Sequence, residues 1–404
     1  MKSTFARTLA LIWFLAIGAW GGTNITLWSF DPNQGDAGNP IGNQLISDGL
    51  GNLYGVTYGG GANGNGAVFE LSPDKRGGWK EAVRHSFGSG KDGAYPYGGL
   101  VLDQKGNLYG TTSTGGTNGT GCVYQLVASS WTESVLYSFG AVGSGDGNYP
   151  YAGVAMDSQG NLYGTTFEGG ANNDGALYAL APNGDGTWSE TVLHSFSNTG
   201  DGAQPAGDVL VDRAGKLFGT TTSGGNERLG TVYEAENTIN GWVEQVLYSF
   251  DGHHGGNPEF VHLIEDANGN LYGTASLGGL HNEGTVWELA TASRKKRPPA
   301  ILHSFGPNTS NDGLVPYAGV LLGPNGSLFG TTYYGGTRYG TVFALSKGKW
   351  KEKVLYRFLG GADGGLVASA VIADSQGNLY GMANIGGTYG AGVVFEITPQ
   401  AHTP

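Results

Sequence analysis

A sevenfold internal repeat constrains this chain more than any other feature of its sequence. The segment Gly-Asn-Leu-Tyr-Gly-Thr-Thr, or a close variant of it, recurs every 51 to 57 residues, beginning at Gly51, Gly106, Gly160, Gly215, Gly269, Gly326 and Gly377. A Ser-Phe pair, which is Arg357-Phe358 in its last occurrence, and a segment of the form Val-Phe-Glu-Leu each recur seven times as well. Each repeat is therefore one structural unit, and such units bury their apolar surface against their neighbours.

Every unit contains four runs of strand-like sequence. In the second unit these runs cover 99–103, 107–112, 121–126 and 131–139, and the last of them alternates with period two from Trp131 to Phe139. The Asp-x-x-Gly between the first two runs is typical of a tight hairpin turn. A content of 76 Gly and 15 Pro suits many short strands. Four antiparallel strands per unit predict an all-β, seven-bladed β-propeller.

The two ends of the chain indicate how the ring closes. After Ile397 the last unit has no fourth run, whereas the run from Ile25 to Phe30 precedes the first complete unit. We expect this N-terminal strand to complete the last blade, which would remove free sheet edges. In the alternative frame each blade begins at its Ser-Phe strand and all seven blades are self-contained. The long connection after Ser-Phe, expected between blades, favours the shared blade.

The N-terminal residues have the pattern of a secretory signal peptide. Lys2 and Arg7 are followed by an apolar run from Leu9 to Ile17 and then by small residues. This pattern predicts a signal peptide over 1–22 and a single propeller domain over 23–404. The apolar run is too short to span a bilayer, so we expect no transmembrane segment in the mature chain. We expect a secreted monomer, extracellular or periplasmic.

The charge balance excludes one class of partner. The chain has 21 Lys and Arg against 33 Asp and Glu, a net charge of -12, which repels phosphate backbones. Nucleic acid is therefore not an expected partner. The basic run 294–297 stands out from this background and is expected to be a solvated insertion between two strands. No cofactor motif occurs, and a divalent metal, though possible chemically, has no motif to support it.

An aspartate recurs in the loops that follow the Ser-Phe pairs. The series includes Asp92, Asp146, Asp201, Asp312 and Asp363. These side chains could form a carboxylate ring that binds a cation, but Asp in such loops commonly bonds the backbone N–H groups of its own turn. We expect the second, structural role. Three histidines, His85, His194 and His303, stand where other units have Tyr and are expected to pack between strands.

Tyrosines follow the loop prolines in three units. Tyr97, Tyr151 and Tyr317 lie on the face where the connecting loops and the Gly-Gly loops are expected to meet. Tyrosine offers an apolar ring and a hydroxyl, so these residues could stack on a sugar or a peptide side chain. The alternative is packing against the neighbouring blade.

One unit departs from the repeat more than the others. His253 and His254 lie in its connecting loop, and His281 and Glu283 lie in its Gly-Gly loop. His262 replaces the glycine that other units have at Gly99, Gly153, Gly207 and Gly319. These five residues could bind Zn²⁺, and His254 and His262 could also contact a ligand or act in acid–base chemistry. Neutral drift of a single repeat explains the same pattern.

The repeat motifs resemble the GloVer tandem-repeat family of bacterial secreted proteins. The resemblance rests on Gly-Asn-Leu-Tyr-Gly-Thr-Thr, the Gly-Gly pair, Gly-Thr-Val-Tyr-Glu-Leu and Trp-x-Glu-x-Val-Leu-Tyr-Ser-Phe, and covers roughly residues 25–398. It implies no catalytic residues. Proteins of this kind often carry a surface-sorting tail, whereas this chain stops at Pro404, so free secretion is the expectation.

Two functions follow as hypotheses. Seven regular units with no catalytic constellation predict a non-catalytic binding or scaffold module, secreted or surface-associated, with an extracellular glycan or protein ligand on the loop face. The alternative is an extracellular propeller enzyme, such as a metal-dependent hydrolase, lactonase or lyase, with its site at the channel mouth.

Overall fold

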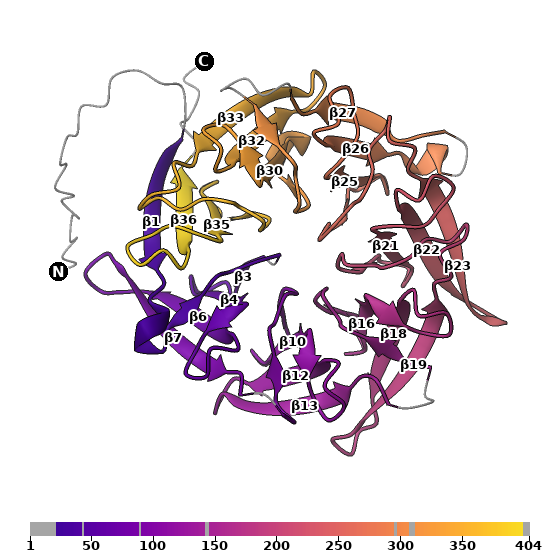
Figure 1. Ribbon diagram of the computed structural model, residues 1–404, viewed down its shortest axis with the longest axis horizontal. Coiled ribbons are helices and arrows are strands. Elements are labelled where there is room, and N and C mark those ends of the chain that lie inside the picture. The colour runs from indigo at the N-terminus through magenta and orange to yellow at the C-terminus, as the bar shows by residue number, and fades with distance from the viewer. Residues whose placement is uncertain are drawn as a thin grey trace, which may run out of the picture.

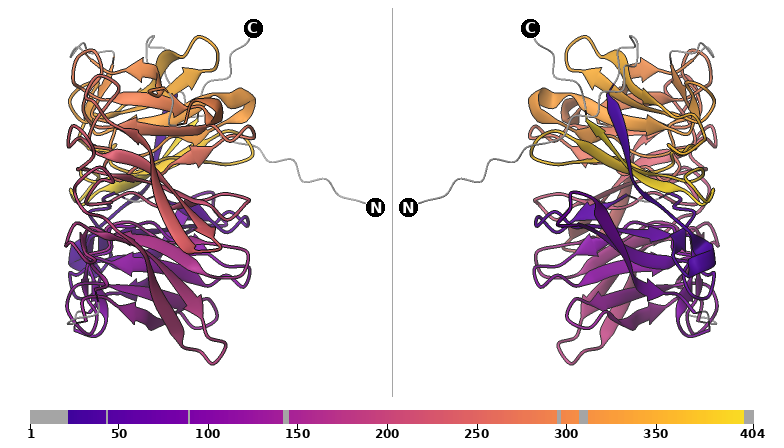
Figure 2. Two further views of the ribbon diagram at one scale, coloured as in Figure 1. Left: turned by 90° about the vertical axis from the view of Figure 1, so that its right-hand side faces the viewer. Right: turned by 90° about the vertical axis from the view of Figure 1, so that its left-hand side faces the viewer.

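The computed structural model describes residues 22–42, 44–88, 90–141, 145–294, 297–306 and 312–398. Except for Gly22, the predicted signal peptide over 1–22 lies outside these residues. In the described part of the chain, the strands form seven four-stranded antiparallel sheets. These sheets are arranged as blades around a central axis (Figure 1), and Figure 2 shows the ring from its edge. The predicted seven-bladed β-propeller is confirmed.

In blades 1 to 6 the strands follow one another outward from the axis in chain order, and in blade 7 the N-terminal strand lies outermost. Blades 1 to 3 consist of β3 (Ile46–Ser47), β4 (Leu53–Thr57), β6 (Ala67–Pro73) and β7 (Trp79–Ser86); of β9 (Val101–Leu102), β10 (Leu108–Thr112), β12 (Cys122–Val127) and β13 (Thr132–Ser138); and of β15 (Ala155–Met156), β16 (Leu162–Thr166), β18 (Ala176–Pro182) and β19 (Trp188–Ser195). Blades 4 to 6 consist of β20 (Leu210–Val211), β21 (Leu217–Thr221), β22 (Thr231–Thr238) and β23 (Gly241–Ser249); of β24 (Ile264–Glu265), β25 (Leu271–Ala275), β26 (Thr285–Leu289) and β27 (Ala300–Ser304); and of β29 (Leu321–Leu322), β30 (Leu328–Thr332), β32 (Thr341–Ser346) and β33 (Lys351–Arg357). Blade 7 consists of β34 (Ile372–Ala373), β35 (Leu379–Ala383), β36 (Val393–Thr398) and β1 (Thr23–Ser29).

The N-terminal strand closes the ring, as predicted. β1 pairs antiparallel with β36, from Thr23 opposite Thr398 to Ser29 opposite Val393. In Figure 1 it forms the outermost strand of blade 7, beside the strands that end the chain. The strand begins two residues before Ile25 and ends one residue before Phe30. The self-contained frame is therefore wrong, because the last blade is built from both ends of the chain.

Short ladders hold the connecting loops against the Gly-Gly loops on one face of the disc. They are β2 (Ala37–Gly38) with β5 (Gly59–Gly60), β8 (Gly93–Ala94) with β11 (Thr114–Gly115), β14 (Gly147–Asn148) with β17 (Glu168–Gly169), β28 (Gly313–Leu314) with β31 (Tyr334–Gly335), and the single bridges Ala203–Ser223, Gly256–Leu277 and Gly365–Ile385. We call this side the loop face. Three short 3₁₀ turns, η1 (Pro32–Gln34), η2 (Thr291–Ser293) and η3 (Pro324–Gly326), complete the described elements.

The Ser-Phe motif joins each blade to the next. Its phenylalanine is fully buried in all seven repeats and packs against an aromatic ring in the third strand of the following blade. The pairs, with ring centroids 4.9 to 5.8 Å apart, are Phe30–Phe69, Phe87–Tyr124, Phe139–Tyr178, Phe196–Tyr233, Phe250–Trp287, Phe305–Phe343 and Phe358–Phe395. The apolar core therefore lies between blades, so each unit is stable only beside its neighbours.

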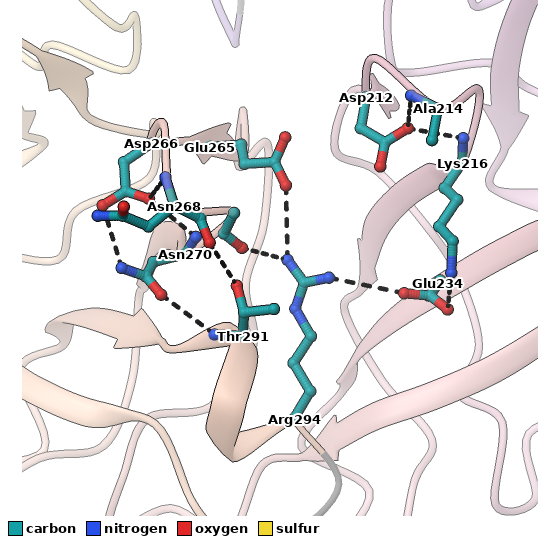
Figure 3. A network of polar contacts seen from close by, with 11 residues as sticks. Asp212, Ala214, Lys216, Glu234, Glu265, Asp266, Asn268, Asn270, Thr291 and Arg294 are labelled. Atoms are coloured by element: carbon teal, nitrogen blue, oxygen red, sulfur yellow. Dashed lines mark hydrogen bonds and ion pairs between the residues drawn. The ribbon is translucent and has the colours of Figure 1, made fainter.

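The basic run is not simply solvated. Arg294 is only 13% exposed and lies between blades 4 and 5, where its guanidinium is 3.6 Å from Glu234 and 3.7 Å from Glu265 (Figure 3). It also lies over the ring of Phe218, 4.7 Å from the centroid. At Arg294 the expectation of a solvated insertion is therefore wrong, because this side chain joins two neighbouring blades. Over the described residues, no helix is long and apolar enough to cross a bilayer.

Candidate functional site

The register of the innermost strands identifies a pair of functional groups at the axis. Val101, Leu210 and Ile264 occupy equivalent positions, since each pairs with the aromatic residue of the Leu-Tyr or Leu-Phe motif in its blade. The residue two positions earlier is Gly99 in blade 2, Asp208 in blade 4 and His262 in blade 5. The assignment of Gly207 as the counterpart of His262 is therefore wrong, and Asp208 was missed.

Asp208 lies where five blades converge. Its Oδ2 atom is 2.9 Å from Nδ1 of His262 in blade 5, and its Oδ1 atom accepts a hydrogen bond of 2.6 Å from the backbone N–H of Gly153 in blade 3. A Cβ atom built on Gly99 of blade 2 would be 3.9 Å from Asp208 Oδ2 and 3.8 Å from the backbone nitrogen of Gln44 in blade 1. Blades that are far apart at the rim can meet this closely only at the axis.

The histidine of this pair is oriented by the aspartate. Its side chain is 42% exposed, and Nδ1 faces the carboxylate. Burial lowers the pKa of His262, but the hydrogen bond and the charge of Asp208 outweigh this effect, so that the pKa is raised above its ordinary value. An imidazole held by a carboxylate in this way is a competent acid or base toward a group at its other nitrogen.

Aromatic rings cover the axis on the loop face. Tyr97 packs edge-on against Tyr151 at 5.1 Å, and Phe260 from blade 5 lies parallel to Tyr97 at 6.1 Å. Phe260 also reaches blade 1, where its ring would be 3.4 Å from a Cβ atom on Gly42. Burial and the neighbouring phenols of Tyr58 and Tyr151 raise the pKa of Tyr97 to about 12, so its hydroxyl stays a neutral donor. Two of the three predicted tyrosines thus lie together.

Tyr317 belongs to a second aromatic group in blade 6. Its ring packs against Tyr333 at 5.0 Å, and Tyr333 packs against the exposed ring of Tyr334 at 4.7 Å. Burial raises the pKa of the Glu259 carboxyl, whose charge in turn acts on Tyr317. Glu259 and Phe260 were missed because blade 5 has one extra residue between its loop proline and its hairpin aspartate, which hides their equivalence to the tyrosines.

A groove lies on the loop face beside this aromatic cover. It has a volume of about 670 Å³ and lies between the loops of blades 1 and 2, where it is lined by Asn65, Gly90, Lys91, Ala94, Tyr95, Thr114 and 115–119. The ring of Tyr95 stacks on Tyr58 at 4.8 Å, which fixes its position. The groove therefore offers one rigid aromatic ring among hydroxyl, amide and ammonium groups.

The remaining residues of the unusual repeat are divided between different contacts. His254 bonds Asp251 through Nδ1 at 2.8 Å, and the rings of His253 and His254 lie 4.9 Å apart. His281 and Glu283 both lie against the position that a Cβ atom on Gly306 would take. His262 contacts Asp208 instead. Among the described residues, two groups of three or more ligand atoms lie within 4.8 Å of one another, and neither includes any of these five residues.

The loop aspartates lie in the interfaces between blades. Each bonds its own turn, as when Asp92 accepts from Gly93 N–H at 2.8 Å, and each also meets the residue before the Ser-Phe pair. That residue is Tyr in some interfaces and His in others: Tyr137 lies 2.8 Å from Asp146, and His194 lies 3.1 Å from Asp201. Where these contacts are described, the recurring aspartate therefore bonds its own turn and also contacts the side chain that precedes the Ser-Phe pair.

A glutamate from the next blade completes many of these interfaces. Oε1 is buried without a hydrogen-bond partner in Glu81, Glu133, Glu190, Glu244 and Glu352. Burial and the charge of Asp36 raise the pKa of Glu81 to about 8, and burial and the charge of Asp146 raise that of Glu190 to about 7. For Glu244, burial and the charge of Asp201 raise the pKa to about 8. These carboxyls are therefore protonated in the folded protein well above their ordinary range.

This protonation makes stability depend on pH. Between the ordinary pKa of 4.5 and a folded pKa of about 8, the folded state keeps protons that the unfolded state has lost. Stability should thus be greatest at the acid end of this window and should fall as pH rises through it. We expect the Tm to be several degrees higher at pH 5 than at pH 8.5. The variant E81Q/E190Q/E244Q should show a shallower dependence, and an unchanged slope would contradict this origin.

Comparison with known proteins agrees with the fold. A family model described as the Gloeobacter/Verrucomicrobia repeat matches residues 16–155, 141–306 and 238–404. No curated protein matches the chain.

Several solved structures are similar to the chain in fold, and all of them are distant in sequence. An ancestral GH74 enzyme has a TM-score of 0.59 at 13% identity, with 91% of this chain and 49% of that one covered. The extracellular domain of a protein assigned as a hybrid two-component system from B. thetaiotaomicron has a TM-score of 0.56 at 12% identity, with 94% and 42% covered. A protein from Bacteroides uniformis assigned as a 6-phosphogluconolactonase has a TM-score of 0.51 at 14% identity, with 80% and 85% covered. The chain thus spans less than half of the first two proteins.

These structures share the fold with the chain, whereas the repeat model matches its sequence from end to end. The chain belongs to the Gloeobacter/Verrucomicrobia repeat family.

Proposed function

We propose that the protein is a secreted, non-catalytic binding module that takes an extracellular glycan on its loop face. The observation that carries this proposal is the groove between blades 1 and 2. Its volume of about 670 Å³ suits a short oligosaccharide, because small-molecule sites typically fall between about 300 and 1,000 Å³. The fixed ring of Tyr95 can stack on the apolar face of a sugar, while Asn65, Thr114 and Asn118 can bond its hydroxyls.

The location of the protein is part of the same proposal. The N-terminal pattern over 1–22 supports export, and one similar structure is an extracellular domain. A net charge of -12 also disfavours anionic polymers, so a neutral glycan is the better ligand.

Substitution of Tyr95 tests the groove. The variant Y95A should bind the glycan about five- to thirtyfold more weakly, because losing a stacked ring costs on the order of 1–2 kcal/mol. The measurement is a glycan array followed by titration calorimetry with the best ligand. Y389A is the matched control, since Tyr389 is a 55% exposed tyrosine in a Gly-Gly loop of another blade. Equal binding by wild type and Y95A, or equal loss in both variants, would refute this site.

A specific observation also favours the catalytic alternative. The Asp208–His262 pair, 2.9 Å apart at the axis, has the geometry of an oriented general base. The same glycan incubations should therefore be examined for new reducing or unsaturated ends. Products formed by wild type and abolished in D208N, with Y95A affecting binding only, would identify a hydrolase or lyase instead of a binding module.

A further inference from the structure

Two interfaces between blades bring together three different metal-ligating side chains each. His85 of β7, Asp92 of the following loop and Glu133 of β13 have ligand atoms that all lie within 4.8 Å of one another. The same is true of His303, Asp312 and Glu352 between blades 5 and 6. In both sets the histidine and the aspartate come from one side of an interface and the glutamate comes from the next blade. These sets lie at the rim, away from the axial pair, although the hollow beside the first set shares Lys91 and Thr117 with the groove at Tyr95.

The spacing of the two nearest ligands suits a tetrahedral ion. His85 Nε2 is 3.3 Å from Asp92 Oδ1, and His303 Nε2 is 3.4 Å from Asp312 Oδ1. A tetrahedral Zn²⁺ site with bonds of about 2.0–2.1 Å places its ligand atoms roughly 3.3 Å apart. The glutamate oxygen lies within 4.8 Å of the other two ligand atoms and is the one that would have to move inward.

The third ligand is a glutamate carboxyl that lies beside the aspartate of its own set. Oε1 is buried and without a hydrogen-bond partner in both Glu133 and Glu352. A buried carboxylate oxygen without a donor is costly, and coordination of a cation would satisfy it. The aspartates are held in position by their own loops, since Asp92 also accepts from Gly93 N–H and Asp312 from Gly306 N–H at 3.0 Å. Bonds of this kind orient a ligating carboxylate.

The first of these sites is open to solvent. A hollow of about 470 Å³ is lined by Asp92 and Glu133 together with Lys91, Thr117, Tyr137, Ser138 and 135–136. It provides a path by which an ion can enter and room for a water molecule as the fourth ligand.

We propose that the protein binds a divalent transition metal, Zn²⁺ or an ion of similar preference, at His85, Asp92 and Glu133, and a second one at His303, Asp312 and Glu352. One nitrogen and two oxygen ligands suit Zn²⁺ better than Ca²⁺, which takes six to eight oxygens. Each ion would join two neighbouring blades, so that its binding energy adds to the stability of the ring.

The chain supplies its own control variants. Tyrosine occupies the place of His85 at the interface between blades 2 and 3, where Tyr137 bonds Asp146 at 2.8 Å. H85Y and H303Y therefore install a side chain that this architecture already accommodates, and each removes one imidazole ligand. At the interface between blades 3 and 4, His194, Asp201 and Glu244 hold the same positions but do not form a compact group within the described residues, so this interface should bind no third ion.

The experiment is titration of purified, chelator-treated protein with Zn²⁺, and with Co²⁺ to record the visible absorption of the bound ion. Wild type should bind two equivalents, H85Y and H303Y one each, and H85Y/H303Y none. E133Q keeps the shape of the side chain and should weaken the first site at least tenfold. Zn²⁺ should raise the Tm of wild type and leave that of the double variant unchanged.

Three results would overturn the proposal. The first is no saturable Zn²⁺ binding by wild type, and the second is binding by E133Q that is as tight as that of wild type. The third is retention of both equivalents by the double variant, which would assign the metal to the histidines of blade 5 predicted from the sequence. Thermal melts of each variant without metal show whether it is folded, so a loss of binding through unfolding is recognised.

Discussion

A chain that begins at Asp31 instead of Gly22 should lose its cooperative native fold. The deletion removes β1 and with it every backbone bond that the strand makes to β36. It also removes the fully buried Phe30 and the partly buried Leu27 and Trp28, which pack into the core between blades 7 and 1. Burial of Phe30 alone contributes about 1.5–3 kcal/mol, and the partial burial of the other two side chains adds to it, so the loss is a large share of the stability of a typical domain.

The measurement is a thermal melt followed by near-ultraviolet circular dichroism, with the chain beginning at Gly22 as the control. A peptide covering 22–30, added in trans, should restore part of the signal if the loss comes from the missing strand. An unchanged Tm in the shortened chain would show that the ring does not depend on this closure.

The second large effect is expected where two backbones touch at the axis. A Cβ atom on Gly98 would lie 2.1 Å from the backbone nitrogen of Gly153 and 2.3 Å from the carbonyl carbon of Ala152. No flexible side chain can yield there, because the obstacle is the backbone of blade 3, which Thr111 also binds through a 2.7 Å hydrogen bond to Ala152 O. We expect G98A to destabilise the protein by at least about 3 kcal/mol, beyond the usual range for a small-to-large change.

Gly200 provides the matched control for this substitution. It is exposed, and a Cβ atom there would meet nothing within 4 Å. G200A should leave the urea midpoint within experimental error of wild type. If G98A and G200A unfolded at the same urea concentration, the close approach of blades 2 and 3 would be wrong.

The fold could be predicted because the same strand and turn residues recur in every unit. The glycine-rich motif, the Ser-Phe motif and the Val-Phe-Glu-Leu motif recur in every unit, so seven equivalent units of four strands are visible as a pattern. The closure by β1 followed from counting strands at the two ends of the chain. None of these inferences required knowledge of which residues approach each other across the ring.

The site was harder to predict, because its members come from different blades. Asp208 and His262 hold the same position in successive units, but the adjacent Gly207 matches the glycine of the other units in residue type and hides this equivalence. His85 stands where other units have Tyr, and from the sequence alone this difference indicates only a packing variant. Its possible role becomes visible only when the structure shows the loop aspartate and the glutamate of the next blade beside it. Which residues of different blades approach each other depends on the twist of the strands and on the radius of the ring. The period of the sequence repeat specifies neither of them.

The pairing of β1 with β36 has a consequence for the order of folding. The first strand to be synthesised finds its partner only when the last has been made, whereas every other blade can assemble from neighbouring segments of the chain. Contacts between such distant segments form slowly. Until then the strand exposes Leu27, Trp28 and Phe30, and blade 7 has an open edge. Refolding at high protein concentration should therefore yield dimers in which the N-terminal strand of one chain closes the ring of another.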